Sequence, residues 1–428
     1  MLSEIDPILG VRGSKSADFN QRRPDLLSLQ KERIIYGYFY RISEGATKYL
    51  SSKRLYIELL GVRTNLYRNF IVCSWNLLND QGVGGLLHPE GVYDDPRGGK
   101  FRKLYYHRLK AHYQFKNSLL LFTDVHDQHV YSINVFGAVK ESINFYNMNT
   151  IFIPTTISAS QKHNRPQDPV PGIKNDDGEW DIRGHNNRIV ILTEKELELY
   201  ANLFEEPGTP GEEARLLQVH SREIMNVLQK IAQIDKRLGD LNGQYYSTDM
   251  FNETNAQRDG IITRQENPTY QPKEAHEWIL SGPHFFVGTP LNKTPRASCV
   301  SSAQYDDINL TEIPSNYFPR GVYRPGNKNG DIKAFNNAIV SWPTNNEPIS
   351  DKYRHVNRRM VQPANERTLI CAIIPKYSTH INSALSLTFN KHDQMVLFNG
   401  ACSSICYDFL VKSGGKANCL HDVMSQIP

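Results

Sequence analysis

The sequence predicts an α/β fold: an incomplete open sheet that ends in a β-hairpin, then a long helix and an α+β domain. Three observations support this prediction. Residues 70–136 change repeatedly between helical and strand periodicity, and residues 212–241 carry apolar side chains at three-four spacing. Beyond residue 243 the chain changes to short β-like runs with many prolines and aromatic residues.

Length and composition set broad limits on function. A chain of 428 residues with 39% apolar residues can bury cores for two or three domains. Its net charge of only +4 neither requires nor excludes nucleic acid as a partner. No apolar run approaches the roughly 20 residues that span a bilayer, and the six cysteines lack zinc-site spacing. We therefore expect a cytoplasmic protein with reduced thiols, no membrane contact and no metal.

The sheet elements follow one another between residues 70 and 136. Residues 70–78 predict a helix, which glycines 82–85 end, and residues 84–87 predict a short strand. Because Pro89 and Gly91 oppose further ladder pairing, residues 88–93 are expected to form a loop at the strand's carboxyl end, where open α/β sheets bind ligands. A helix over 100–113 and a hairpin of strands 119–122 and 130–136 complete this part.

The rest of the sequence completes a prediction that the whole chain has four divisions. Residues 144–157 precede an exposed loop at 158–187 and a strand at 188–192, and a capping box at 193–196 opens a helix that runs to residue 204. Residues 207–211 read as a linker, and 212–241 as one amphipathic helix that packs on its own protein. The predicted divisions are 1–143, the end of the sheet domain; 144–211, an insertion or linker; 212–243, the long helix; and 244–428, a recognition domain.

Basic residues form the main candidate binding surfaces. Residues 97–116 contain seven Lys or Arg side chains and no acidic one, which suits phosphate contacts, although a solvated basic face is an equal alternative. In the carboxyl-terminal half, residues 293–296, 320–324 and 352–359 place basic side chains among tyrosines, a pattern that fits phosphate contact and base stacking.

Other motifs are better explained by turns. Residues 267–270, Asn-Pro-Thr-Tyr, could grip an exocyclic amine only at the end of a buried strand, and residues 263–266 do not have that pattern. Residues 126–129 contain two histidines and an aspartate in an expected hairpin turn, without further metal ligands nearby. No glycine-rich phosphate loop and no nucleophile motif occur.

Several short segments resemble, in order, the later motifs of large N6-adenine DNA methyltransferases. This family includes the type IIG restriction-modification enzymes and the methyltransferases of the BREX and DISARM phage-defence systems. The similar segments are LLHPEGVYDD at 86–95, FKN at 115–117, LF at 121–122, DV at 124–125 and SINV at 132–135. Residues 278–288, 305–314, 366–370 and 372–375 resemble the family's target-recognition region.

The resemblance implies a class I methyltransferase-like, Rossmann-like sheet and a set of site residues. By position, Phe122 would stack on a flipped adenine, with a packed hairpin residue as the equal alternative, and residues 88–95 would line the side on which the base enters. The residues assigned to that side are His88, Pro89, Tyr93 and Asp94. Those assigned to DNA contact are Lys100, Arg102, Lys103, Arg108, Lys293, Arg296, Arg320, Tyr323, Lys376, His380 and Asn382.

The family's glycine-containing S-adenosylmethionine motif and its Asn-Pro-Pro-aromatic catalytic loop do not occur in this sequence. We therefore assign no catalytic residue here and expect a second polypeptide to supply S-adenosylmethionine binding and catalysis, with double-stranded DNA as the shared ligand. Other defence-system subunits are further possible partners. Two alternatives stay open: a catalytically inactive DNA-binding or regulatory subunit of a defence complex, and a truncated gene product with an incomplete sheet.

Overall fold

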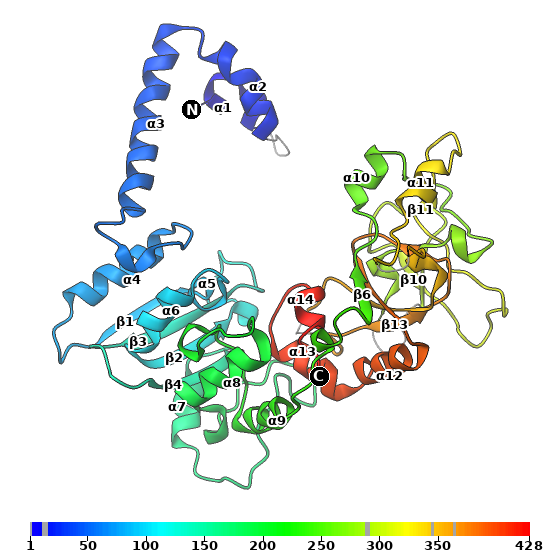
Figure 1. The fold of residues 1–428 in the computed structure, drawn as a ribbon. Helices are drawn as coiled ribbons and strands as arrows, with labels where there is room; N and C mark the ends of the chain where they lie inside the picture. Colours follow the sequence, from blue (N-terminus) through cyan, green and yellow to red (C-terminus); the bar gives the residue numbers. More distant parts are fainter. Residues whose placement is uncertain (1, 11–15, 287–291, 344–345, 363–364) are drawn as a thin grey trace. The chain divides into compact units, whose positions relative to one another are not determined.

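The computed structural model describes residues 2–10, 16–286, 292–343, 346–362 and 365–428 (Figure 1). The chain forms two compact units. The first contains Met1–Glu198 and Thr209–Leu216, and the second contains Leu199–Gly208 and Leu217–Pro428. Within the described residues, no helix is both long enough and apolar enough to cross a membrane.

The first unit begins with helices. They are α1 (Leu2–Ile5), α2 (Ser16–Leu26) and α3 (Gln30–Leu50), and α3 is one long rod (Figure 1). The fourth, α4 (Leu66–Leu77), buries Ile71, Val72 and Trp75 on one face. This helix confirms the prediction of a helix in this region, although it begins at residue 66 and leaves Phe70 and Leu77 exposed.

A five-stranded mixed sheet lies at the centre of the first unit. Its strands are β1 (Gly84–Pro89), β2 (Leu109–Lys116), β3 (Val130–Phe136), β4 (Asn144–Ile151) and β5 (Val190–Thr193), in the order β1-β3-β2-β4-β5. Only the β2–β4 pair is parallel. The protein is thus a mixed α/β protein with smaller antiparallel sheets elsewhere, and the sheet continues beyond residue 143, where the sequence suggested a division.

The hairpin exists, but its first strand was predicted wrongly. Strand β2 pairs with β3 from Lys116↔Val130 to Leu109↔Phe136, so the hairpin begins at residue 109 rather than at 119. The preceding helix, α6 (Gly99–Tyr106), ends seven residues earlier than predicted. Both errors share one cause, since β2 buries His112 and Gln114, which look like solvent-facing helix residues in the sequence.

The predicted loop at 88–93 is also wrong. His88 and Pro89 continue β1, opposite Ser132 and Tyr131, and Gly91–Asp94 then form the one-turn helix α5. Proline is tolerated there because β1 lies at the edge of the sheet, where an N–H group is not needed on the outer side.

Residues 155–204 follow the prediction more closely. Helix α7 (Thr155–Lys162) precedes an irregular segment, and α8 (Glu194–Phe204) follows β5. The hydroxyl of Thr193 donates to Glu196 Oε2 at 2.6 Å and accepts from the Lys195 N–H at 3.3 Å, so the region predicted as a capping box does open this helix.

The long helix predicted for 212–241 is wrong. Only α9 (Arg222–Ala232) is helical in that region, apart from single 3-10 turns. The carbonyl of Glu213 accepts two hydrogen bonds from Arg102, and that of Ala214 accepts one from Tyr106. These carbonyls serve tertiary contacts with α6, so they are not available for a helical ladder.

The second unit is built around a four-stranded antiparallel sheet in the order β13-β12-β15-β6. Its strands are β6 (Tyr245–Thr248), β12 (Arg354–Arg358), β13 (Cys371–Ile374) and β15 (Ala384–Phe389). Helix α12 (His392–Cys402) packs on β12 and β13. The other elements are α10 (Glu253–Arg258), α11 (Lys333–Ala338), α13 (Ile405–Ser413), α14 (His421–Met424), β7 (Ile262–Arg264), β8 (Ile279–Leu280), β9 (Lys293–Pro295), β10 (Tyr305–Asp307), β11 (Tyr323–Pro325) and β14 (Thr379–His380).

Candidate functional site

A buried polar network occupies the carboxyl end of β1. Glu90, at the amino end of α5, accepts a hydrogen bond of 2.9 Å from Gln114 Nε2 and lies 3.2 Å from His112 Nε2. His112 Nδ1 lies 2.7 Å from the side-chain oxygen of Asn147. His112 of β2 thus connects the carboxylate of Glu90 with the side chain of Asn147 on β4.

Glu90 stays ionised in this setting. Burial opposes ionisation of the carboxyl, but the facing His112 and the hydrogen bonds from His112, Ser132 and Gln114 outweigh burial and lower the pKa of Glu90. A buried carboxylate with this many partners fixes the position of the turn that begins at Glu90. The network therefore holds residues 88–95, which the resemblance assigned to the side of the entering base, against strands β2 and β4.

Two of the four residues assigned to the entering base are interior side chains. His88 Nε2 lies 2.9 Å from the Tyr105 hydroxyl, its ring stacks on Tyr67, and burial lowers its pKa. The Tyr93 hydroxyl donates to Asn134 and is fully buried. Both side chains thus pack in the interior beneath the turn at residues 90–94 and are not available to a ligand.

The other two residues of this group are exposed. Pro89 and Asp94 both reach solvent on the outer side of the turn. Protein atoms nevertheless surround the Asp94 carboxyl closely, and this burial, together with the negative charge of Glu90, raises its pKa to about 6. Of the residues that the sequence assigned to the entering base, only these two can meet a ligand.

Phe122 lies in the loop that joins the two strands of the hairpin. Asn117, fully buried, organises this loop: its Nδ2 donates to the carbonyls of Phe122 and Val125 at 2.9 and 2.7 Å, and its Oδ1 accepts from the Phe122 N–H at 3.0 Å. The Phe122 ring meets Tyr131 edge to face at 5.1 Å but keeps 42% of its surface exposed. Three side-chain hydrogen bonds therefore hold a half-exposed aromatic ring at a fixed place.

The basic segment after residue 97 is only partly exposed. Arg102 is buried and donates to the carbonyls of Asp95 and Glu213, so it cannot contact DNA from this position. Arg108 is partly buried with its guanidinium over the Trp75 ring. Lys100 and Lys103 are exposed, and Lys103 pairs with Glu212. Two of the four predicted basic contacts thus remain on the surface.

In the second unit, two predicted DNA contacts are interior. Tyr323 is buried and its hydroxyl donates to Glu253. His380 is fully buried, 2.9 Å from the Ser386 hydroxyl, and burial lowers its pKa to about 3. Both side chains are structural, so the assignment to direct DNA contact is wrong for them in this conformation.

The remaining predicted contacts in the second unit lie at or near the surface. Lys293 is the first residue of β9 and pairs with Asp307 of β10 at 3.5 Å. Arg296 follows the end of β9 and pairs with Asp306 at 2.9 Å. A phosphate would have to compete with these carboxylates. Three others are partly exposed: Arg320 donates to the Pro295 carbonyl, Lys376 lies over the Tyr353 ring, and Asn382 accepts from the Glu253 N–H.

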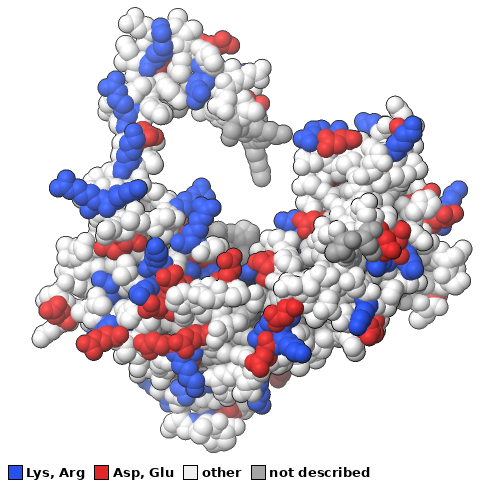
Figure 2. Space-filling model, in the orientation of Figure 1, with Lys and Arg blue, Asp and Glu red and all other residues white. Residues whose placement is uncertain are grey.

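Charge over the visible surface is mixed. On the face drawn in Figure 2, basic and acidic side chains are interspersed rather than gathered into one basic stripe.

The turn at 267–270 exposes Asn267, so no pocket encloses its side chain. Among the residues that the structure describes, no three His, Cys, Asp or Glu side chains gather closely enough to hold a metal ion.

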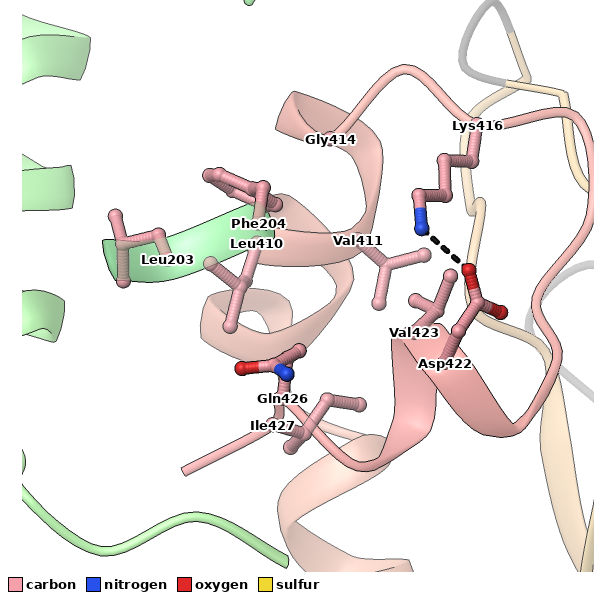
Figure 3. A pocket seen from close by; sticks show the side chains of 10 residues that line it. All are labelled: Leu203, Phe204, Leu410, Val411, Gly414, Lys416, Asp422, Val423, Gln426 and Ile427. Carbon is pink, nitrogen blue, oxygen red and sulfur yellow. Dashed lines mark hydrogen bonds and ion pairs between the residues drawn. The ribbon is translucent and has the colours of Figure 1, made fainter. Parts of the chain in front are cut away.

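A small hollow in the second unit has no matching chemistry (Figure 3). Its cavity volume is only about 20 Å³, it is lined mainly by apolar side chains, and it contains the Lys416–Asp422 ion pair. Its lining residues are Leu203, Phe204, Leu410, Val411, Gly414, Lys416, Asp422, Val423, Gln426 and Ile427. None of the residues that the sequence assigned to binding is among them.

The buried polar network and the residue that anchors the hairpin loop were not predicted from the sequence. The network includes Glu90, His112 and Asn147, and the side chain of Asn117 anchors the hairpin loop. One signal was available: polar residues alternate at 112 and 114, at 132 and 134, and at 147 and 149, in three separate segments. Period-two placement of polar groups on neighbouring strands indicates one shared polar face.

Comparisons with known proteins found similarity among solved structures alone. No family model and no curated protein matches the sequence. Among solved structures, the chain is similar to the type IIG restriction endonuclease BpuSI with a TM-score of 0.30 and 12% sequence identity. The match covers 90% of this chain and 44% of that chain, so this chain spans less than half the length of the matched protein.

Proposed function

We propose that this chain is the DNA-recognition and partial catalytic-domain component of an adenine-N6 DNA methyltransferase in a phage-defence or restriction-modification system. A second polypeptide supplies S-adenosylmethionine binding and catalysis. The observation that carries the proposal is the Asn117-anchored hairpin loop with its half-exposed Phe122, next to an open edge of an α/β sheet. An enzyme that acts on a base within DNA needs an aromatic surface against which the flipped base can stack.

The sheet edge supports the need for a second polypeptide. Among the described strands, β1 pairs only with β3, so the backbone N–H and C=O groups on its outer side lack a strand partner. Open edges of this kind are usually covered or paired in stable proteins. A strand from the second polypeptide would pair with β1 and continue the sheet.

S-adenosylmethionine does not fit the residues of this chain alone. In the described sheet, no glycine-rich turn follows a strand and leads into a helix, as dinucleotide and phosphate sites require. The polar side chains at the end of β1 bond to one another and are buried, so they do not line a cleft. We therefore assign the cofactor mainly to the second polypeptide and derive no step through it.

We assign DNA contact to those predicted contact residues whose side chains are at least partly exposed and not held in the interior. These are Lys100, Lys103, Lys293, Arg296, Arg320, Lys376 and Asn382. The target-recognition role belongs to residues 244–428, in line with the resemblance of that region.

Reconstitution tests the proposal directly. The purified chain is expected neither to bind S-adenosylmethionine nor to methylate DNA, whereas co-expression with a neighbouring gene product that carries an Asn-Pro-Pro-aromatic loop restores transfer of labelled methyl groups to adenine. Methylation by the chain alone would overturn the division of labour. Double-stranded DNA binding without restored methylation would instead identify an inactive recognition or regulatory subunit.

Phe122→Ala is expected to lower methylation by the reconstituted pair about 5- to 150-fold in kcat/KM, because base stacking on an aromatic ring is worth about 1–3 kcal/mol. Phe122→Trp keeps the stacking surface and should retain most activity. Leu121→Ala, beside it in the same loop and similarly exposed, is the matched control and should have little effect. An unchanged rate for Phe122→Ala would leave Phe122 a packing residue.

A further inference from the structure

Helix α3 presents an apolar stripe that covers no core. At 100° per residue, Ile34, Ile35, Tyr38, Phe39, Ile42 and Tyr49 fall within one sector about 140° wide. No residue of this 21-residue helix is buried, and Ile34, Tyr38, Phe39, Ile42 and Tyr49 are each more than half exposed. A helix with this pattern normally packs its stripe against another surface.

Small residues share the stripe with the large ones. Gly45 and Ala46 lie within the same sector and are exposed, and a Cβ atom added at Gly45 would meet nothing within 4 Å. Tyr38 and Phe39 pack edge to face on each other, with ring centroids 5.7 Å apart. The stripe therefore has a bulky part at 38–39 and an indented part at 45–46, separated by Ile42.

We propose that α3 pairs with α3 of a second copy of this chain, in antiparallel orientation about Ile42. In that register Tyr38 of one copy faces Ala46 of the other, and Phe39 faces Gly45. Ile42 meets its own equivalent, and Ile35 faces Tyr49. Each bulky ring thus meets a small residue, as interlocking helices require.

A parallel pair would not fit. In that arrangement Tyr38 and Phe39 would meet their own copies while Gly45 faced Gly45, so large groups would collide at one end and leave a gap at the other. The stripe therefore selects the antiparallel pair. This inference is independent of the proposed function, because it uses no residue of the sheet edge or of the hairpin loop.

The contact is long enough for a specific dimer. Residues 34–50 extend for about 25 Å along the helix axis. Six large apolar side chains from each copy over that length approach the lower part of the range for specific interfaces, roughly 1,200 Å² in total.

Light scattering after size-exclusion chromatography tests the dimer with the full chain. At 50 μM the expected mass is 98 kDa, twice the 49.0 kDa of one chain. Tyr38→Glu and Ile42→Glu should each give a monomer. Tyr40→Glu is the matched control, since Tyr40 is an exposed aromatic residue on the opposite face of α3, and it should leave the dimer intact. A monomer at all concentrations up to 200 μM would overturn the proposal.

Ala46→Phe distinguishes the interlocking pair from a merely sticky surface. It adds apolar area but fills the indentation that receives Tyr38, so the dimer should weaken at least 10-fold, whereas a nonspecific patch would associate more strongly.

Disulfide cross-linking gives the orientation in a chain whose more accessible Cys73 and Cys406 are replaced by serine. Ile42→Cys should link to itself, and Tyr38→Cys should link to Ala46→Cys but not to another Tyr38→Cys. The opposite linking pattern would overturn the antiparallel arrangement.

Discussion

Glu90→Ala is expected to lower the unfolding free energy of the first unit by about 3–5 kcal/mol, because it leaves the buried partners His112 and Gln114 without a hydrogen-bond acceptor. The change would leave the His112 ring and the Gln114 amide facing an empty position inside the sheet. Because both groups are buried, water could not replace the lost carboxylate without disturbing strands β1 and β2.

Hydrogen exchange at increasing urea concentration can measure this loss, with peptides that cover residues 84–116 and 130–151. Glu90→Gln keeps one oxygen acceptor and should lose less than Glu90→Ala. The matched control is Glu179→Ala, an exposed glutamate in the same unit, which should change stability by less than about 0.5 kcal/mol. A loss below about 1 kcal/mol for Glu90→Ala would show that the network is dispensable.

Acid is expected to destabilise the second unit steeply below pH 6.5. His355 and His380 are fully buried, and burial lowers their pKa values to about 4 and about 3. In the unfolded chain both titrate near 6.5. As the pH falls from 6.5 toward 4, the unfolded chain gains two protons that the folded unit does not bind, so the free energy of unfolding falls by about 3 kcal/mol per pH unit for the pair.

Chemical unfolding at pH 7.5, 6.0 and 5.0, followed by hydrogen exchange in residues 354–389, should show this dependence. His355→Gln should reduce the slope but not abolish it, because the buried His284 and His380 also have lowered pKa values. His392→Gln, a histidine on the surface of α12, should leave the slope unchanged. If the His355 variant does not fold, NMR of the unaltered chain decides the matter. The buried imidazoles should show no titration between pH 7.5 and 5, and a midpoint near 6.5 would contradict the prediction.

The sequence identified those elements whose apolar pattern is complete within one segment. Helix α4, strand β3 and helix α8 with its capping threonine each follow from residues near one another in the chain. The segment of β2 was misassigned because its buried face carries His112 and Gln114. These residues can be buried only because Glu90, more than 20 residues earlier in the chain, accepts from them, and local periodicity contains no record of that partner.

The candidate site shows the same limit. Sequence order and resemblance placed Phe122 in the hairpin region, but its fixed and half-exposed position depends on Asn117, whose three hydrogen bonds exist only when the loop is closed. Arg102 and Tyr323 were predicted to bind because they lie in basic segments, and His380 was assigned through the resemblance. Their burial became evident only from the backbone and side-chain groups that surround them in space.

The sequence by itself determined the α/β character of the protein and the segments that resemble adenine methyltransferases. Only the tertiary structure decided which polar side chains are interior and which are exposed. The physical reason is that a polar group becomes an interior one when a distant part of the chain supplies its hydrogen-bond partners. Sequence periodicity records which residues share a face, but it does not record which groups will meet across that face.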